Sequence, residues 1–338
     1  MNGVIMMVIA IVVLGGGYLF YGRYLEKKWG IDPNAKTPAY ELEDGVDYVP
    51  ADTNIVFGHQ FASIAGAGPI NGPIQAAIFG WLPVLLWILI GGVFFGAVQD
   101  FASMYASVKN KGRTIGYIIE EYIGKLGKKL FLLFCWLFCI LVVAAFADVV
   151  AGTFNGFVAD DAGVVSKVAA NGAVATTSML FIVEAVALGC ILKYAKLNKW
   201  VNTAIAIVML VAAVALGLYF PMYLTRETWH ILIFIYILIA SVAPVTMLLQ
   251  PRDYLNSYLL IFMIAAAIVG VFVANPSCNL KAFTSFNVDG SYMFPILFVT
   301  IACGAVSGFH SLVSSGTASK QIKNEKNMLP VSYGAMIM

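Results

Sequence analysis

The sequence predicts an all-α, polytopic membrane protein, and three observations support this fold class. Of the 338 residues, 61% are hydrophobic and 11% are charged, whereas about 25% of the residues are charged in a typical soluble protein. Several apolar runs reach the roughly 20 residues that a helix needs to cross a bilayer. The basic residues between these runs are concentrated in every second loop. These features exclude a soluble protein built around a water-excluded core.

The apolar runs predict nine membrane-spanning helices and the beginning of a tenth. The first run lacks the basic leading region and small-residue cleavage site of a signal peptide, so we interpret it as a retained helix. The tenth is too short to cross, which predicts that further segments complete the protein. Between the spans, 23–55 is polar and 110–129 has the pattern of an amphipathic surface helix. The predicted spans are 3–22, 58–80, 82–107, 130–157, 173–192, 200–220, 229–249, 254–274 and 292–312, with the tenth beginning near Leu329.

The distribution of basic residues predicts the orientation of these spans. If the N-terminus is outside, all but three of the 20 lysines and arginines lie on the cytoplasmic side, the exceptions being Lys167, Arg226 and Lys281. This bias is the one that the positive-inside rule describes. It requires 58–80 to cross the membrane fully, because a re-entrant loop there would invert every later span. We therefore expect a multi-pass protein of a bacterial or archaeal inner membrane with an external N-terminus.

The second predicted span carries residues that interrupt a helix. Its stretch FGHQFASIAGAGPINGPIQ (57–75) is rich in glycine and also contains two prolines, which loosen the backbone or remove hydrogen-bond donors. At membrane depth, freed backbone groups are tolerated only where they line a cavity or bind a ligand. We therefore predict a broken helix that crosses the membrane.

A second break is predicted around Ala240–Pro244 in the seventh span. Five helices separate the two breaks and the crossing direction is reversed, which is the pattern of an inverted five-plus-five repeat transporter with broken helices at the bilayer midplane. The alternative is that Pro244 only kinks its helix. The repeat divides a single transmembrane domain, 1–338, into an extra helix (3–22), a first five-helix repeat (58–220) and an incomplete second repeat (229–338).

Three motifs are long enough to be compared with known families: FGHQFASIAGAGPINGP (57–73), GAVQDF (96–101) and SGFHSLVSSGTASKQI (307–322). They resemble the carbon starvation protein A family, in order and across essentially the whole chain, which looks like a short member without its last helices. The resemblance implies an inner-membrane transporter that is induced when carbon runs short and is associated with uptake of peptides and, in some members, pyruvate. It also implies a fold of the amino acid–polyamine–organocation type, in agreement with the repeat.

One departure from the family concerns the substrate. Relatives linked to peptides and pyruvate continue after the corresponding histidine with Ala-Thr-Gln-Ser-Pro. This chain instead has Ser311-Leu-Val-Ser-Ser-Gly-Thr317. The difference puts the substrate in doubt and leaves the fold unaffected.

Candidate substrate-binding residues lie at the two breaks. His59 begins the broken span, and a histidine titrates near physiological pH, so it can carry a proton or bind a carboxylate. The alternative for His59 is a helix-end residue whose ring is satisfied by backbone carbonyls. Asn71 and Gln75 could bond an amide or carboxylate of the substrate, or cap the second half-helix. The full set of candidates is His59, Gly66, Gly68, Asn71, Gln75 and Ser241.

Candidate ion-coupling residues lie in the ninth, fourth and fifth spans. His310, Ser314 and Thr317 have the spacing i, i+4, i+7 and are expected to share one helix face, where they could instead form a polar helix–helix contact. Asp148 and Glu184 lie inside apolar spans, where an ionisable group is a functional candidate by default. These two could also be protonated or paired with each other.

Three further residues are candidates for a gate or an anchor. Gln99 and Asp100 lie towards the cytoplasmic end of the third span, where we favour a gate or helix-anchoring contact. Lys320 ends the ninth span and could simply extend its ammonium group to the inner surface.

These observations favour a secondary active transporter of peptides or pyruvate-like compounds, driven by proton or sodium symport. No GxxxxGK[ST] nucleotide motif is present, so ATP is not expected to drive it. A channel would need a filter repeated by oligomeric symmetry. An intramembrane enzyme using His310 with Ser311 or Ser314 lacks a GxSxG elbow and an identifiable third residue. A sensor that only reports the substrate is a remaining alternative, although this sequence contains no soluble output domain.

We expect no cofactor beyond the coupling ion, no metal and no nucleic acid. Cys135 and Cys139 are one helical turn apart, but no histidine or carboxylate lies close by, so we interpret the five cysteines as packing residues. The expected partners are the small-molecule substrate and the lipid bilayer.

Overall fold

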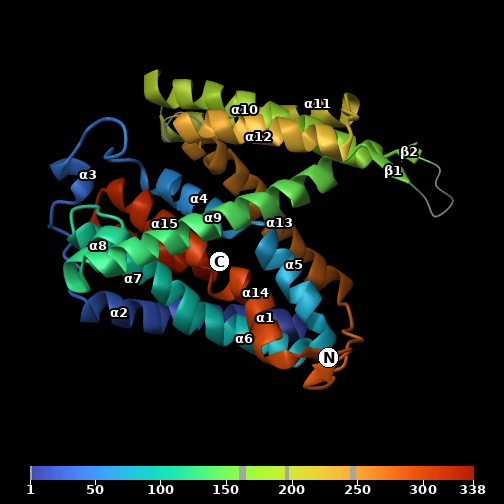
Figure 1. Ribbon diagram of the computed structural model, residues 1–338, viewed down its shortest axis with the longest axis horizontal. Helices are drawn as coiled ribbons and strands as arrows, with labels where there is room; N and C mark the ends of the chain where they lie inside the picture. Colours follow the sequence, from blue (N-terminus) through green and yellow to red (C-terminus); the bar gives the residue numbers. More distant parts are fainter. Residues whose placement is uncertain (1, 160–164, 195–197, 244–248) are drawn as a thin grey trace. The chain divides into compact units, whose positions relative to one another are not determined.

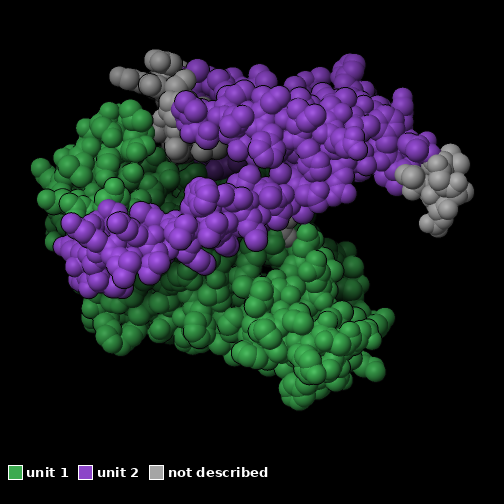
Figure 2. Space-filling model, viewed as in Figure 1, with its two compact units in different colours: residues 1–118, 256–338 green, residues 119–255 purple. Residues whose placement is uncertain are grey.

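The computed structural model describes residues 2–159, 165–194, 198–243 and 249–338 (Figure 1). Within these residues, seven helices are long and apolar enough to cross a membrane. This confirms the prediction of an all-α polytopic membrane protein. The chain forms two compact units, unit 1 (1–118 and 256–338) and unit 2 (119–255), which Figure 2 colours separately.

Unit 1 contains the N-terminal helices and the last part of the chain. Its described elements are α1 (Gly3–Gly16), η1 (Gly17–Gly22), α2 (Arg23–Lys28), α3 (Pro38–Glu41), α4 (Thr53–Ile64), α5 (Ala67–Ala76), η2 (Ala77–Phe79), α6 (Trp81–Gly91), η3 (Gly92–Gly96), α7 (Ala97–Lys109), β3 (Asn287–Val288), β4 (Ser291–Tyr292), α14 (Met293–Ala305), α15 (Gly308–Gly316), η4 (Ala318–Lys320), η5 (Glu325–Asn327), η6 (Leu329–Gly334) and α16 (Ala335–Ile337).

Unit 2 consists of four long helices and a hairpin, namely α9 (Lys125–Phe154), β1 (Phe157–Ala159), β2 (Val165–Lys167), α10 (Ala169–Tyr194), α11 (Lys199–Tyr219) and α12 (Arg226–Val242). The strands β1 and β2 pair antiparallel, with Phe157 opposite Lys167. Two helices, α8 (Ile115–Tyr122) and α13 (Leu249–Ala274), contain the boundaries between the units. The single amphipathic helix predicted over 110–129 is wrong, because Gly124, with φ of 105°, separates α8 from α9.

The second predicted span is broken, as its glycines and prolines indicate. The helix α4 ends at Ile64, and Gly66 is extended (φ −82°, ψ −167°) before α5 begins. Pro69 lies in the first turn of α5, where its missing N–H is not needed. Pro73 lies inside α5 and so removes the donor that would reach the carbonyl of Pro69.

The ninth predicted span is also broken, although we expected a continuous helix over 292–312. The helix α14 ends at Ala305, and α15 begins at Gly308 after the extended residue Ser307. The Ser307 hydroxyl accepts a hydrogen bond from the N–H of Phe309 at 3.3 Å. This hydrogen bond is the usual serine N-cap, and it stabilises the start of a new helix at Gly308.

The two broken helices run antiparallel to each other. The second half of the first, α5, packs along the first half of the other, α14, while α15 packs against α4 and α7. Glycines permit this close approach, because a Cβ atom at Gly68 would collide with Cys303 and one at Gly72 would lie 2.5 Å from the carbonyl oxygen of Thr300. The two breaks therefore lie beside one another inside unit 1.

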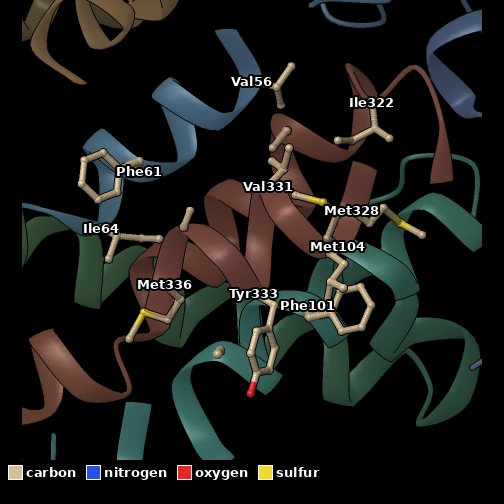
Figure 3. Packing of buried hydrophobic residues seen from close by; sticks show 14 of the residues in the cluster. Val56, Phe61, Ile64, Phe101, Met104, Ile322, Met328, Val331, Tyr333 and Met336 are labelled. Carbon is tan, nitrogen blue, oxygen red and sulfur yellow. The ribbon is translucent and has the colours of Figure 1, made fainter. Parts of the chain in front are cut away.

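An apolar cluster supports this arrangement from the side of α4, α7 and the end of the chain (Figure 3). Phe61, Phe101, Met104 and Tyr333 are each buried to 2% exposure or less. Tyr333 also donates a hydrogen bond from its hydroxyl to the carbonyl of Val93 in η3 at 3.1 Å. The cluster thus holds α4 and α7 in place around the breaks.

The second predicted break lies partly outside the described residues. The helix α12 ends at Val242, and Ala243 is extended (φ −68°, ψ 141°). Pro244 lies outside the residues that the structure describes. The next helix, α13, begins at Leu249.

Candidate functional site

A buried polar cluster lies where α4, α7 and α15 meet in unit 1. Gln60 on α4 and Asp100 on α7 are each 0% exposed, and His310 on α15 is 1% exposed. Buried polar groups are costly unless they are paired. Their presence together among apolar helices marks this cluster as the candidate functional site.

The centre of the cluster is a hydrogen-bonded pair of His310 and Asp100. The Nδ1 atom of His310 lies 2.6 Å from both carboxylate oxygens of Asp100. Such charge-assisted hydrogen bonds are short and strong. With the Nδ1–H donated to Asp100, the second ring nitrogen of His310, Nε2, is the atom that can gain or lose a further proton.

Gln60 ties the pair to the broken helix. Its side-chain amide donates to the backbone carbonyl of His310 at 3.2 Å and approaches Asp100 Oδ2 at 3.5 Å. On the neighbouring position of α7, Gln99 donates to the hydroxyl of Ser311 at 3.2 Å. Three elements therefore converge on one carboxylate and one imidazole.

Three polar atoms of the cluster have no hydrogen-bond partner among the described residues. They are Oε1 of Gln60, Nε2 of His310 and Oγ of Ser314. All three residues are at most 1% exposed. Because unsatisfied buried polar groups are uncommon in native proteins, each one calls for a functional or solvent-mediated explanation.

A cavity of about 280 Å³ opens at the break between α4 and α5. Its wall includes Phe61, Ile64, Gly66, Pro69 and Pro73. The lining is mainly apolar side chains, and the first turn of α5 borders it. The cavity therefore combines an apolar wall with a half-helix N-terminus, which carries a partial positive charge.

The structure places only some of the predicted substrate-binding residues at the cavity. Gly66 lines the cavity, whereas Gly68 packs against Cys303. Asn71 and Gln75 are exposed and do not line this cavity. These two residues are one turn apart on an exposed face of α5, which the glycine pattern alone did not reveal.

Two further predicted substrate-binding residues lie outside the cavity wall. His59 is 6% exposed, and its backbone carbonyl accepts a hydrogen bond from Ser63 at 2.7 Å. Ser241 belongs to unit 2, is exposed, and donates its hydroxyl to the carbonyl of Leu238 at 2.8 Å.

The structure does not show the alternative in which Asp148 pairs with Glu184. Asp148 accepts hydrogen bonds from Arg226, at 2.6 Å to each oxygen, and lies 3.1 Å from His230 Nε2. The Asp148 side chain is 53% exposed, so this cluster is not a buried site. The Oε2 atom of Glu184, on α10, has no hydrogen-bond partner in the part of the chain that the structure describes.

The expected shared face of His310, Ser314 and Thr317 exists only in part. His310 and Ser314 lie one turn apart on α15 and are both buried. Thr317 follows the end of α15 and is not helical (φ −124°, ψ −58°). Lys320, in η4, lies 3.4 Å from Asp47 Oδ2, so it contacts the polar segment that precedes α4.

A buried carboxylate that contacts the end of α7 was not predicted from the sequence. Glu325 is 2% exposed and lies 2.7 and 2.8 Å from Lys109 Nζ through its two oxygens. It also accepts the backbone N–H of Asp32 at 3.0 Å. This contact fastens residues 29–52, which we call the strap, to the end of α7 that carries Lys109.

Comparison with known proteins identifies the family. The family model described as "Carbon starvation protein CstA" matches residues 2–338. This chain belongs to the CstA family. No solved structure matches it.

Curated members of the family include proteins named for two kinds of substrate. The peptide transporter CstA of Escherichia coli (strain K12) is 36% identical over 340 residues, covering 95% of this chain and 46% of that protein. The peptide transporter CstA of Bacillus subtilis (strain 168) is 37% identical, covering 100% and 56%. The pyruvate/proton symporter BtsT of Escherichia coli (strain K12) is 35% identical, covering 95% and 45%. The chain spans about half the length of these relatives.

Family membership gives the site its context, and one residue missed by the sequence analysis, Gln60, had a recognisable signal. Gln60 directly follows His59 in the FGHQ motif, and a glutamine inside a membrane helix is a recognisable signal. Asp100 was expected in a gate or a helix-anchoring contact, and the structure pairs it with His310 on another helix. Glu325 carried no such signal, because it lies in a polar segment between predicted spans.

Proposed function

We propose that this protein is a secondary active transporter that imports peptides or pyruvate-like carbon compounds together with protons. The names of its relatives support both substrate classes, and one of them is named a proton symporter. Seven apolar helices of membrane-spanning length support a multi-pass membrane location. The observation that carries the proposal is the buried His310–Asp100 pair.

The charge of this pair links proton binding to burial. With one proton shared between Asp100 and His310 beyond the Nδ1–H, the pair is neutral overall. Without that proton, it leaves one net negative charge in a site that is at most 1% exposed. Burying an uncompensated charge costs several kcal/mol. A site that is closed to water therefore favours the protonated pair, and the proton has to be bound when the site closes.

The cavity at the break supplies a place for the substrate. Pyruvate and peptides both carry a carboxylate, and the N-terminus of α5 offers unpaired backbone N–H groups and a favourable dipole. Ile64 and Phe61 would contact the apolar part of the substrate. Because α4 also carries Gln60, substrate and proton sites share one helix.

Several finer features belong to the same proposal. The break at Gly66 and the extended Ala243 after α12 support an inverted five-plus-five repeat of the amino acid–polyamine–organocation type, although the break at Ser307 was not part of that expectation. We propose an inner-membrane location with the N-terminus outside, from the positive-inside bias. We also propose that the protein is not an enzyme, as the names of its relatives suggest.

The test is uptake into proteoliposomes that contain the purified protein. Labelled pyruvate and a labelled dipeptide are supplied with an imposed proton gradient, an imposed sodium gradient or neither. We expect the proton gradient to drive accumulation of one solute, and His310→Gln and Asp100→Asn to abolish that accumulation. The matched controls are His230→Gln and Asp148→Asn, which change the same residue types in the exposed cluster. Accumulation driven only by sodium, or full proton-driven accumulation in both site variants, would refute the proposal.

A further inference from the structure

A line of buried hydroxyl groups continues from the His310–Asp100 pair along the interface of α7 and α15. Ser314 and Ser315 follow His310 on the next turn of α15, and Ser319 lies in η4. Ser107 lies two turns beyond Asp100 on α7. All four serines are 0% exposed. Such a concentration of hydroxyls is unexpected in a contact that packing alone could provide.

The far end of this line is a hydrogen-bonded pair of hydroxyls. The Oγ atoms of Ser107 and Ser319 lie 2.8 Å apart, and each lies 2.9 Å from the backbone carbonyl oxygen of Ser315. Only one hydroxyl can donate to the other while the second donates to the carbonyl. The two donors can exchange these roles by rotation, and such reversible polarity is what a proton relay requires.

The two ends of the line are separated along α7. From Asp100 to Ser107 the helix rises roughly 10 Å, at about 1.5 Å per residue. The residue between them on that face is Met104, which is 0% exposed and packs in the apolar cluster. A thioether does not donate a proton, so α7 does not bridge the gap.

The α15 side of the interface has a hydroxyl at the required level. Ser314 lies one turn after His310, and side chains at this spacing have Cβ atoms about 5–6 Å apart, a distance that one water molecule spans. Both Ser314 Oγ and His310 Nε2 lack a hydrogen-bond partner among the described residues. The two unpartnered atoms are therefore adjacent members of the line.

We propose that Ser314, Ser107 and Ser319 form the route by which the proton held at His310–Asp100 leaves towards the end of α7 that carries Lys109. This proposal rests on the proposed function, since it assigns a path to the coupled proton. The proton on His310 Nε2 passes to the Ser314 oxygen as the hydroxyl proton of Ser314 moves on to the Ser107–Ser319 pair. The Ser107–Ser319 pair releases one of its own hydroxyl protons to solvent water at the end of α7, so each hydroxyl loses one proton as it gains another. In net terms, one N–H bond breaks and one O–H bond forms on that water, which leaves a neutral imidazole that donates Nδ1–H to Asp100.

The charged groups along the elements that line the route are consistent with its direction. His59 lies on α4 at the level of Gln60. Lys109, on α7, is held by Glu325 at the far end, and Lys320 in η4 lies near Asp47. The route thus starts at one buried titratable pair and ends beside a second charge pair at the rim of the unit.

The experiment compares two variants of nearly equal size, Ser314→Thr and Ser314→Val. The first keeps the hydroxyl and the second removes it. Each purified variant is reconstituted into proteoliposomes, and two rates are measured: proton-driven net uptake of the labelled substrate, and exchange of labelled for unlabelled substrate at equal concentrations. Net uptake requires the proton to leave in every cycle, whereas exchange of the loaded carrier does not.

We expect Ser314→Val to slow net uptake by about tenfold or more, in keeping with the usual contribution of a positioned proton-transfer group. Exchange should remain close to the wild-type rate, and Ser314→Thr should retain both activities. Ser107→Ala should reproduce the selective loss. As a control, Ser332→Ala removes a buried hydroxyl that donates to the carbonyl of Met328 and should change neither rate.

Two outcomes would overturn the route. Unchanged net uptake in Ser314→Val would show that the proton does not need this hydroxyl. Equal loss of uptake and exchange, also in Ser314→Thr, would assign Ser314 to packing or to substrate movement. Both outcomes leave proton symport at His310–Asp100 standing, because that proposal fails only if wild-type uptake is independent of the proton gradient or if the pair is dispensable.

Discussion

The ion pair between Lys109 and Glu325 gives a quantitative prediction about what holds the strap to α7. Glu325 is 2% exposed and receives three hydrogen bonds, two from Lys109 and one from the backbone of Asp32. The Lys109 side chain is 35% exposed. A buried carboxylate that loses its cation cannot recover hydration without opening the structure, so its partner should be worth more than a surface contact.

The magnitude follows from this mixed exposure. Breaking a fully buried pair by removing one partner costs about 3–5 kcal/mol, whereas exposed pairs contribute about 0–1 kcal/mol. Because water reaches Lys109, we expect Lys109→Met to lower the free energy of unfolding by about 2 kcal/mol. Glu325→Gln keeps the shape and one acceptor, so we expect about 1 kcal/mol. The double variant should lose less than the sum by about 1–2 kcal/mol, which is the coupling energy of the pair.

The measurement is a double-mutant cycle in equilibrium unfolding of the purified protein in mixed micelles. The matched control is the cycle for Lys320 and Asp47, a pair 3.4 Å apart in which the Asp47 side chain is 53% exposed. We expect its coupling energy to lie below about 0.5 kcal/mol and to disappear in high salt. A Lys109–Glu325 coupling as small as that of the control would refute the reasoning, because burial of Glu325 would then confer no added dependence on Lys109.

Two further predictions concern packing around the breaks. Gly72→Val should destabilise the fold by about 3 kcal/mol or more, measured as above, because its Cβ would lie 2.5 Å from a backbone oxygen of α14, whereas Asn71→Val on the exposed face should change stability by less than about 1 kcal/mol. Tyr333→Phe should cost about 1 kcal/mol through loss of the hydrogen bond to η3, against no measurable change for the exposed Tyr24→Phe. Equal effects within either pair of variants would contradict the close packing or the hydrogen bond.

Local sequence signals predicted the broken second span because the cause is local. Glycine and proline act on their own backbone, and the break at Gly66 lies within the quoted motif. The break at Ser307 has a comparable signal, a serine N-cap followed by glycine, but the surrounding apolar residues suggested a continuous span. Hydropathy reports burial in the membrane and is insensitive to where one helix ends and another begins.

The pairing of His310 with Asp100 could not be read from the sequence in the same way. The two residues are 210 positions apart, and their contact depends on how α15 packs against α7. Both residues were singled out from resemblance and polarity, but in separate roles. Asp148 was singled out by the same reasoning and lies in an exposed pair instead. Polarity within an apolar run identifies candidates, and only tertiary packing decides which of them are buried together.

The break in the ninth span places the buried pair beside a helix N-terminus. His310 is the third residue of α15 and therefore lies in its first turn. The partial positive charge at a helix N-terminus favours the anionic carboxylate of Asp100 beside it and opposes the positive charge of a protonated imidazole. Burial acts in the opposite sense, because it favours the neutral, loaded pair. A continuous helix through Ser307 would remove the first of these effects and leave the effect of burial unopposed. For the proton symport proposed above, the break thus sets a force towards proton release against the retention that burial favours.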